Sequence, residues 1–493
     1  MNIWQQDWIS RWALYSPDRP AIHEQDSGNS ITYAELNLKA NGIAKYLKSQ
    51  YQVDKGDRIA IIADFNIDYV ALFAAAQKAG FIIVPVNYRL AQAEIKDILV
   101  DSSPKILLAD EKYDHLISDD YSSIKISYNI LDAINGSSDF DLIPVSEDDP
   151  VFIIYTSGTT GKAKGVKYTH KMLFWNSINT SLSLKLNTES RTVNVMPPFH
   201  TGGWNVLLTP FLHHGGFVSL CNKFDGEKVL EAISAMKCNI FMGVPTMLAM
   251  MANEDNFSSA NISCLDYIIV GGESMPIPLI EKYAAKGIAI RQGYGMTEVG
   301  PNLTSLHQDD AISKKGSIGR PNFYVEHKII KENGQQASAN EAGELWLRGP
   351  MVTPGYWHNA PATRDAFSDD GVWFKTGDIV IEDADHYLYI VDRLKNMYIS
   401  GAENVYPAEI EKVLRQLQDV QECAVIGVKD EKWGEVGKAF IVTAKDFTMD
   451  EETIRNHCLS RLAKYKVPKY FVFKDTLPKT DSGKIDRKSL KFL

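Results

Sequence analysis

Hydrophobic and polar positions in the first third of the chain alternate between the spacing of helices and that of strands. Three stretches predict helices by their helical spacing or their alanine content, namely residues 31–47, 69–78 and 93–100. Gly80 follows the second stretch and is suited to end it as a C-cap. Four short, almost continuous apolar runs predict buried strands at residues 58–62, 81–86, 106–108 and 151–155. Strands that alternate with helices predict βαβ units on a mostly parallel sheet.

The pattern changes in the second half of the chain. Residues 325–330 and 343–349 alternate at period two around a Glu-Asn-Gly turn, and short strand-like runs follow at 373–378 and 387–391. They predict an antiparallel sheet or a small barrel. Further on, a helix at 407–417, with Pro407 in its first turn, and strand-like runs at 398–406 and 423–428 predict a small α+β domain of about a hundred residues. Residues 114–149 are polar and weakly patterned, and predict a surface excursion.

Composition narrows the class of protein. The 493 residues suggest more than one domain, and 45% hydrophobic with 23% charged residues is ordinary for a soluble globular protein. The net charge of -10 disfavours a general nucleic-acid binder, because phosphate backbones demand clustered positive charge. The first residues lack the pattern of a signal peptide, and no apolar run approaches the length needed to cross a bilayer.

The cysteines indicate neither a zinc site nor a disulfide framework. The chain has five of them, an odd number, and they are scattered without a C-x-x-C pair. A reducing compartment is the default for this usage, and together with the missing signal and membrane-span patterns it leads us to expect a cytoplasmic protein.

The densest candidate chemistry lies in the loop at residues 155–165. After the predicted strand at 151–155 come four Ser or Thr hydroxyls, three glycines and two lysines within eleven residues. Glycines let backbone N–H groups surround an anion, and lysines supply charges suited to phosphate, so the loop is either a phosphate-binding site or a flexible surface turn. It is not a P-loop, because that pattern requires Gly in place of Thr156 and a hydroxyl in place of Ala163.

Other candidates are ambiguous when each is taken alone. His200, in a Pro- and Gly-rich bend, is a base, a ligand, a pocket wall or a packed core histidine. Asp378 follows Thr-Gly and either holds a diol or stabilises a turn. The lysines of the last 30 residues, Lys484 among them, read by themselves as a solvated basic tail.

Five segments taken in order are more specific. They are the loop at 155–165, Gly-Tyr-Gly-Met-Thr-Glu at 293–298, Thr-Gly-Asp at 376–378, Asp-Arg-Leu-Lys at 392–395 and Gly-Lys at 483–484. In this order they resemble the adenylate-forming superfamily, which contains acyl- and aryl-CoA synthetases, the adenylation domains of nonribosomal peptide synthetases, and luciferase. The resemblance covers nearly the whole chain and is strongest to bacterial fatty-acid–CoA ligases.

The resemblance implies an α/β fold with two domains. Residues 1–394 would form a large N-terminal AMP-binding domain of layered α/β subdomains plus a small β-barrel-like part. Residues 395–493 would form a small mobile α+β domain that rotates about a hinge near Lys395, with the active site at the junction.

The resemblance also implies a reaction. A carboxylate attacks the α-phosphate of ATP with magnesium, which gives an acyl-adenylate and pyrophosphate, and the thiol of CoA then displaces AMP. The apolar segment 198–216 lacks an evident basic partner for a second carboxylate, which favours a fatty or aryl acid. Four alternatives remain: a carrier-protein-loading enzyme, a fatty acyl-AMP ligase, an o-succinylbenzoate-type ligase, and a nucleotide-binding regulator without catalysis. The expected partners are small molecules, and the sequence allows a homo-oligomer.

Residue roles carry over from the resemblance position by position. The pyrophosphate-holding loop corresponds to Thr156, Ser157, Gly158, Thr159, Thr160, Gly161 and Lys164. Many relatives have proline where this chain has Ala163, which loosens the loop without removing a donor. The adenine pocket and ribose contacts correspond to Gly271, Gly272, Glu273, Tyr294, Gly295, Met296, Asp378 and Arg393.

The remaining roles concern catalysis and domain motion. Thr297 would contact the α-phosphate, Glu298 would bind magnesium, and Lys484 would bridge the carboxylate and the α-phosphate. Lys395 matches the hinge, and Gly401 would line the tunnel for the pantetheine arm of CoA. His200 matches a position near the acyl pocket and would gate between the half-reactions.

Overall fold

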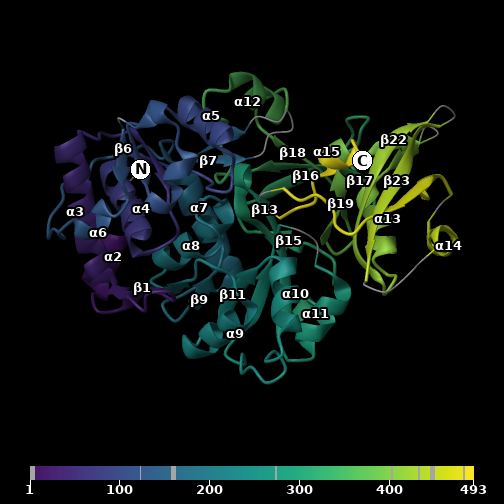
Figure 1. Ribbon diagram of the computed structural model, residues 1–493, viewed down its shortest axis with the longest axis horizontal. Helices are drawn as coiled ribbons and strands as arrows, with labels where there is room; N and C mark the ends of the chain where they lie inside the picture. The colour runs from purple at the N-terminus through teal and green to yellow at the C-terminus, as the bar shows by residue number, and fades with distance from the viewer. Residues whose placement is uncertain are drawn as a thin grey trace. The chain divides into compact units, whose positions relative to one another are not determined.

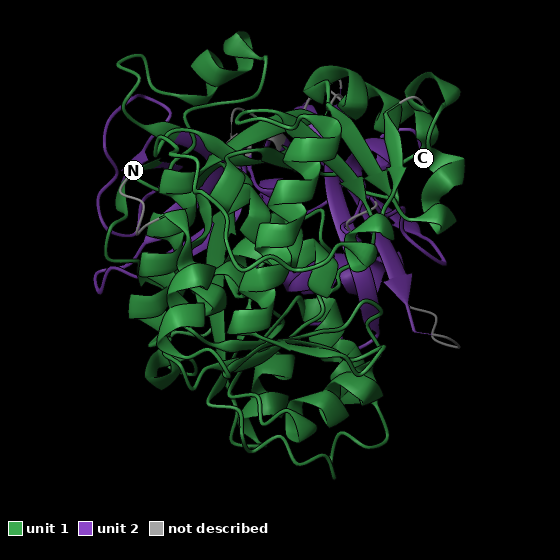
Figure 2. Cartoon of the chain, turned by 90° about the vertical axis from the view of Figure 1, so that its left-hand side faces the viewer, with its two compact units in different colours: residues 1–327, 347–374 green, residues 328–346, 375–493 purple. Residues whose placement is uncertain are grey.

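A computed structural model describes most of the chain in two compact units. The described residues are 6–122, 124–156, 163–272, 275–400, 403–430, 433–444, 450–462, 464–480 and 483–493, with only the backbone described at 395, 403 and 404. The first unit comprises Met1–His327 and Leu347–Phe374, and the second comprises Lys328–Trp346 and Lys375–Leu493 (Figure 2). No helix within the described residues is both long enough and apolar enough to span a bilayer.

The first unit contains a six-stranded sheet in the order β6-β5-β3-β4-β7-β8. Its strands are β3 (Arg58–Ile62), β4 (Ile82–Pro85), β5 (Ile106–Ala109), β6 (Lys125–Ser127), β7 (Pro150–Thr156) and β8 (Lys164–Thr169). Neighbours pair in parallel except β7 and β8, which form an antiparallel hairpin. The predicted mostly parallel α/β sheet is therefore confirmed, and the polar excursion at 114–149 contributes its edge strand β6.

Helices cover both faces of this sheet, which explains the continuous apolar runs. They are α3 (Tyr33–Tyr51), α4 (Ile67–Ala79) and α5 (Gln92–Ser102) (Figure 1). Alternate residues of β3 enter different cores: Ile59 and Ile61 pack with α3 and α4, whereas Ala60 and Ile62 pack with α5. Gly80 ends α4 with φ +75°, as predicted.

Two further sheets complete the first unit. One has the order β11-β12-β13-β14-β15 and the other β2-β1-β10-β9. Their strands are β1 (Pro20–Glu24), β2 (Ser30–Thr32), β9 (Arg191–Asn194), β10 (Phe217–Leu220), β11 (Ile240–Gly243), β12 (Tyr267–Val270), β13 (Ala289–Met296), β14 (Gly300–Ser305) and β15 (Arg320–Pro321). The helices of this region are α7 (His170–Leu184), α8 (Leu208–His213), α9 (Gly226–Ala235), α10 (Pro245–Asn253) and α11 (Ile277–Ala284).

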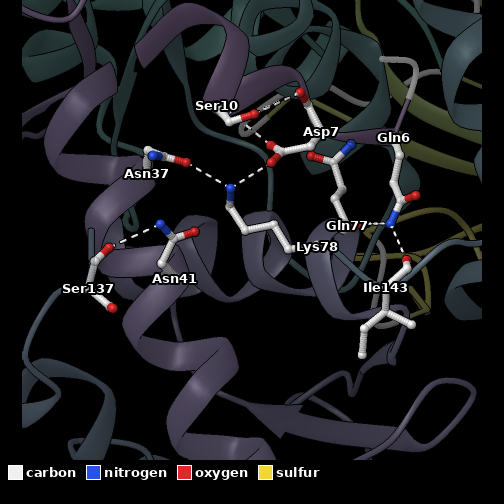
Figure 3. A network of polar contacts seen from close by, with 9 residues as sticks. All are labelled: Gln6, Asp7, Ser10, Asn37, Asn41, Gln77, Lys78, Ser137 and Ile143. Atoms are coloured by element: carbon white, nitrogen blue, oxygen red, sulfur yellow. Dashed lines mark hydrogen bonds and ion pairs between the residues drawn. The ribbon is translucent and has the colours of Figure 1, made fainter. Parts of the chain in front are cut away.

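A buried polar network attaches the start of the described chain to α3 and α4 (Figure 3). Asp7 caps helix α2 (Trp8–Tyr15) and forms an ion pair of 2.6 Å with Lys78, whose Nζ also donates to Asn37. Gln6 donates from its Nε2 to the carbonyls of Gln77 and Ile143. Because the ionic side chains are only 2–3% exposed, each charge depends on the other for its stability.

The second unit is built mainly from antiparallel pairs. Most of the sheet β16-β17-β18-β19 belongs to it, with strands β16 (Glu326–Ile330), β17 (Ala342–Arg348), β18 (Phe374–Glu382) and β19 (Leu388–Arg393). A second sheet joins β20 (Tyr398–Ser400), β21 (Glu403–Val405), β22 (Val420–Asp430), β23 (Gly434–Thr443) and β24 (Tyr470–Phe473). Helices α13 (Pro407–Leu414) and α14 (Glu451–Leu459) contribute apolar side chains to the same core as this sheet.

Helix α13 is shorter than predicted. It ends at Leu414 rather than at residue 417, because the Arg415 N–H bonds back to the carbonyls of Glu411 and Val413 and closes the last turn. Pro407 occupies its first turn, as predicted.

Candidate active site

The β7–β8 hairpin carries the predicted pyrophosphate loop. Thr156 ends β7 and pairs with Lys164, the first residue of β8. Gly165 allows the two strands to approach, because a Cβ there would lie 2.7 Å from Cγ2 of Ile153. Seven predicted site residues lie outside the described residues: Ser157, Gly158, Thr159, Thr160, Gly161, Glu273 and Gly401.

The segment from Tyr294 to Glu298 forms a tight reversal between β13 and β14. Met296 pairs with Gly300, and the turn η4 (Thr297–Val299) lies between them. Gly295 is required at this point, since a Cβ would lie 2.1 Å from the carbonyl oxygen of Pro301. Thr297 and Glu298 are both buried, with 8% and 7% exposure. A carboxylate this buried requires partners.

Tyr356 supplies one of those partners. Its hydroxyl donates to Oε1 of Glu298 at 3.1 Å, and the Thr353 N–H donates to the Glu298 carbonyl at 2.7 Å. Burial, followed by the Glu298 charge, raises the pKa of Tyr356 far above its ordinary value, so the phenol remains a donor. The ammonium of Lys164 lies 5.1 Å from the centre of the same ring. One side chain thus contacts both the predicted metal carboxylate and a predicted phosphate-binding lysine.

The glycines after β12 lie at the same sheet edge as Tyr294. β12 and β13 pair in parallel with Val270 opposite Gln292, so Gly271 and Gly293 follow at equivalent positions. A Cβ on Gly271 would lie 3.7 Å from the Gly293 carbonyl oxygen, and Gly272 has φ +85°. The predicted adenine-binding residues Gly271 and Tyr294 therefore lie near each other at the ends of neighbouring strands.

His200 lies in the bend that follows β9. The His200 carbonyl accepts from the Gly203 N–H, and its ring lies 4.8 Å from that of Phe199. The apolar side chains that follow are buried in the largest core cluster: Trp204, Val206, Leu207, Leu208, Phe211 and Leu212. These six residues are core, whereas Phe199, which is also buried, contacts the ring of Tyr88.

An asparagine network joins this bend to the Glu298 turn. Asn302 of β14 donates from Nδ2 to the carbonyl of Val206 and to the hydroxyl of Thr180 in α7. Asn176 of α7 donates to the carbonyl of Asn205. Sequence reasoning missed this network, because its members come from three separate elements.

In the second unit, Asp378 and Arg393 face each other across β18 and β19. They are paired in register, and Arg393 Nε lies 2.8 Å from Asp378 Oδ1. Asp378 is 2% exposed and lies within β18 rather than in a turn. The two predicted ribose-binding residues are therefore brought together by the strand register.

Asp392 connects the end of β19 to α13. Its carboxylate accepts from the N–H of Ala408 at 2.7 Å and from the side chain of Asn396 at 3.1 Å. Burial raises the pKa of Asp392 above the ordinary value for aspartate, although these hydrogen bonds oppose the shift. The predicted hinge residue Lys395 lies in the short turn η6 (Leu394–Asn396).

Lys484 is exposed on a hairpin near the end of the chain. Its carbonyl accepts from the Thr480 N–H, and Lys479 pairs with Ile485. Arg487, three residues later, forms an ion pair with the buried carboxylate of Glu411 in α13, which anchors the segment. Sequence reasoning assigned no role to Tyr356 and Thr353, which contact Glu298, or to Arg487, which contacts Glu411. The only local signal for Tyr356 was its place after Gly355.

Comparisons with known proteins show the family to which the chain belongs. A family model of AMP-binding enzymes matches residues 9–357, and a model of the AMP-binding enzyme C-terminal domain matches residues 409–484. A feruloyl-CoA synthase from Amycolatopsis sp. is 37% identical, and the match covers 97% of this chain and 96% of the relative. A long-chain-fatty-acid–CoA ligase, FadD13 of Mycobacterium tuberculosis, is 36% identical over the same shares of both chains.

A solved structure extends the similarity to three dimensions. The o-succinylbenzoate-CoA synthetase MenE of Bacillus subtilis, in complex with its acyl-adenylate intermediate, has a TM-score of 0.89 at 32% identity, covering 98% of both chains. The same enzyme has been solved with ATP and a magnesium ion, with a TM-score of 0.87 at 32% identity, covering 98% of this chain and 99% of the other. The predicted superfamily and α/β fold class are confirmed. The chain belongs to the family of AMP-binding enzymes, as an adenylate-forming ligase of the acid–CoA type.

Proposed function

We propose that the protein activates a fatty or aryl monocarboxylic acid with ATP and transfers the acyl group to CoA. The similarity of nearly the whole chain to feruloyl- and fatty-acid–CoA ligases carries this proposal. Glu298, Asp378, Arg393 and Lys484, at the positions of the family's motifs, support it. A carboxylate is a poor nucleophile toward an anionic phosphate, so such a site must neutralise charge and orient both reactants.

The chain's own residues suit magnesium. Glu298 offers a buried carboxylate oxygen, the hard ligand type that Mg²⁺ prefers, and Mg²⁺ commonly binds one or two carboxylates together with substrate phosphates. The described residues contain no cluster of three or more metal-ligating side chains, which fits a cation held largely by the nucleotide. When bound, the ion would neutralise the phosphates. Glu298 would position it.

The remaining residues of the first unit would hold ATP. Lys164 and the loop that begins at Thr156 would bind the departing pyrophosphate, and Thr297 would donate to the α-phosphate. Tyr294, Gly295 and Met296, with Gly271 and Gly272, would border the adenine. His200, whose ring contacts that of Phe199, would gate the acyl pocket.

The second unit would supply the other contacts. Asp378, in its ion pair with Arg393, would accept from the ribose hydroxyls, and Lys484 would neutralise charge between the substrate carboxylate and the α-phosphate. We propose a boundary between residues 394 and 395 with Lys395 as the hinge, which the hydrogen bonds of the neighbouring Asp392 support. Rotation there would replace Lys484 by the loop of Gly401, which would receive the arm of CoA.

Two finer points belong to the same proposal. The five free cysteines support a cytoplasmic location, because thiols persist in a reducing compartment. A homo-oligomeric state stays a prediction.

The test is AMP release from ATP and magnesium against a panel of carboxylic acids, each with and without CoA. AMP formation that requires both CoA and a fatty or aryl acid supports the proposal. Carboxylate-dependent pyrophosphate exchange without CoA-dependent AMP identifies a carrier-loading enzyme instead. The Lys484→Ala variant, purified in parallel, controls for contaminating ligases.

A further inference from the structure

Glu298 is bound at both its backbone and its side chain by one segment distant in sequence. That segment, Thr353–Trp357, is here called the clamp segment. Thr353 donates its N–H to the Glu298 carbonyl at 2.7 Å, and Tyr356 donates its hydroxyl to Oε1 at 3.1 Å. Two contacts on one residue fix its position and the rotation of its side chain, whereas one would fix only the position.

The clamp segment is itself fixed on β8. Val166 and Tyr356 form an antiparallel bridge, and the Trp357 N–H donates to the Gly165 carbonyl at 2.7 Å. The Thr353 hydroxyl donates to the Lys167 carbonyl at 2.8 Å. Since β8 begins at Lys164, the strand that leaves the phosphate loop also holds the clamp segment.

The backbone of the clamp segment is adapted to this role. Gly355 has φ +134°, and a Cβ there would lie 2.4 Å from Cγ2 of Thr363. The Thr363 hydroxyl in turn accepts from the Tyr356 N–H at 3.0 Å. The backbone of Tyr356 is therefore held by contacts that do not involve Glu298.

The Tyr356 side chain makes two kinds of contact, one through its hydroxyl and one through its ring. Its hydroxyl engages Oε1 of Glu298, while the ammonium of Lys164 lies over its ring, 5.1 Å from the centroid. A hydrogen bond to one carboxylate oxygen orients the other, and the partners that orient metal ligands typically contribute tenfold to a hundredfold to metal affinity.

We propose that Tyr356 is a positioning residue that orients the Glu298 carboxylate for the magnesium ion of Mg·ATP and aligns Lys164 with the same phosphates. The inference rests on the proposed function, because it takes Glu298 as the magnesium carboxylate. Beyond that function, it assigns to Tyr356 a contact between the start of β8, which follows the phosphate loop, and the metal-binding carboxylate.

The test compares three substitutions of matched size. Tyr356→Phe removes only the hydroxyl and keeps the ring beneath Lys164. Tyr168→Phe, on β8, is the control, because Tyr168 is fully buried and, within the described part of the chain, its hydroxyl has no hydrogen-bond partner. Glu298→Gln sets the scale for loss of the carboxylate charge.

The first readout is Mn²⁺ binding, measured by electron paramagnetic resonance with an ATP analogue that carries a methylene between the α- and β-phosphates. Tyr356→Phe should weaken binding about tenfold or more, and Tyr168→Phe should stay within about twofold of the unsubstituted protein. The second readout is AMP formation against magnesium concentration. Here the half-saturating concentration should rise in Tyr356→Phe, while kcat at saturating magnesium recovers to within about threefold.

The outcomes distinguish a failure of this inference from a failure of the proposed function on which it rests. If Glu298→Gln weakens Mn²⁺ binding and Tyr356→Phe does not, the positioning role is wrong and the proposed function stands. If Glu298→Gln leaves binding unchanged, the metal assignment fails and the inference fails with it. A loss of kcat in Tyr356→Phe that saturating magnesium does not restore, with unchanged Mn²⁺ binding, also overturns the positioning role.

The ring contact is tested by Tyr356→Leu. This variant loses both the hydroxyl and the ring, so it should show the magnesium defect of Tyr356→Phe together with a raised KM for pyrophosphate in the exchange reaction. Equal KM values for pyrophosphate in the two variants would remove Lys164 from the inference.

Discussion

The buried ion pair between Lys78 and Asp7 offers a sharp test of how the first unit is held together. Lys78 Nζ lies 2.6 Å from Asp7 Oδ2 and 2.7 Å from Asn37 Oδ1, and the ionic side chains are 3% and 2% exposed (Figure 3). Lys78→Met keeps the length of the side chain and removes its charge. The Asp7 carboxylate then remains buried without its counter-ion.

The free energy that Lys78→Met should cost follows from this burial. Removing one partner of a buried pair typically costs about 3–5 kcal/mol, because the remaining charge has lost its compensation. Asp7 also accepts the Ser10 N–H at 3.1 Å as the cap of α2, so the loss should appear first as opening of that helix. At 1.4 kcal/mol per factor of ten, opening of α2 should become about a hundredfold to a few thousandfold more frequent.

Hydrogen exchange read by mass spectrometry on peptides from α2 measures this opening. The matched control is Lys45→Met, which removes an exposed lysine that lies 2.7 Å from Asp139 and should cost about 1 kcal/mol or less. The double variant Asp7→Asn/Lys78→Met leaves no charge and keeps an amide oxygen for the cap, so it should recover more than half of the summed losses. If the losses of the two single variants instead sum to the loss of the double variant within about 0.5 kcal/mol, the two residues act as independent sites and the reasoning is refuted.

Two further predictions concern catalysis and pH. Lys484→Ala should lower adenylation by about a hundredfold or more while sparing thioester formation from preformed acyl-adenylate, and equal loss in both half-reactions would contradict its role. Burial lowers the pKa of His170 to about 4 from its ordinary 6.5, so the unfolded chain binds a proton between these values that the folded chain does not. Stability should therefore fall as the pH drops below 6.5, by about 2 kcal/mol at pH 5. His170→Gln should remove that share of the loss, as measured by denaturant unfolding at pH 8 and pH 5, and an equal pH dependence in both proteins would exclude His170 as its source.

Local periodicity determined much of the fold. The run at residues 58–62 forms β3, and the helix before Gly80 is α4. Each follows from its local pattern, because the apolar residues must be buried and the glycine permits the backbone to turn. The order of five short motifs was enough to identify the family, since each motif fixes residue types that the chemistry requires.

Local sequence was less informative at element ends and edges. Helix α13 ends three residues before the predicted position, where backbone bonds from Arg415 close its last turn. The edge strand β6 lies in a segment too polar to predict, because an edge strand needs a neighbour more than an apolar pattern.

Only the tertiary structure decided which distant residues meet. Asp378 and Arg393 were each predicted, but their ion pair depends on the register of β18 and β19. Lys78 is 71 residues from Asp7, and Tyr356 is 58 residues from Glu298, and neither contact leaves a periodic trace in the sequence. Sequence determined the elements, the family and the kinds of residue in the site, because those depend on neighbours along the chain. The partners that orient Glu298 and neutralise Asp7 depend on how strands and helices pack, and packing brings them together only in the folded protein.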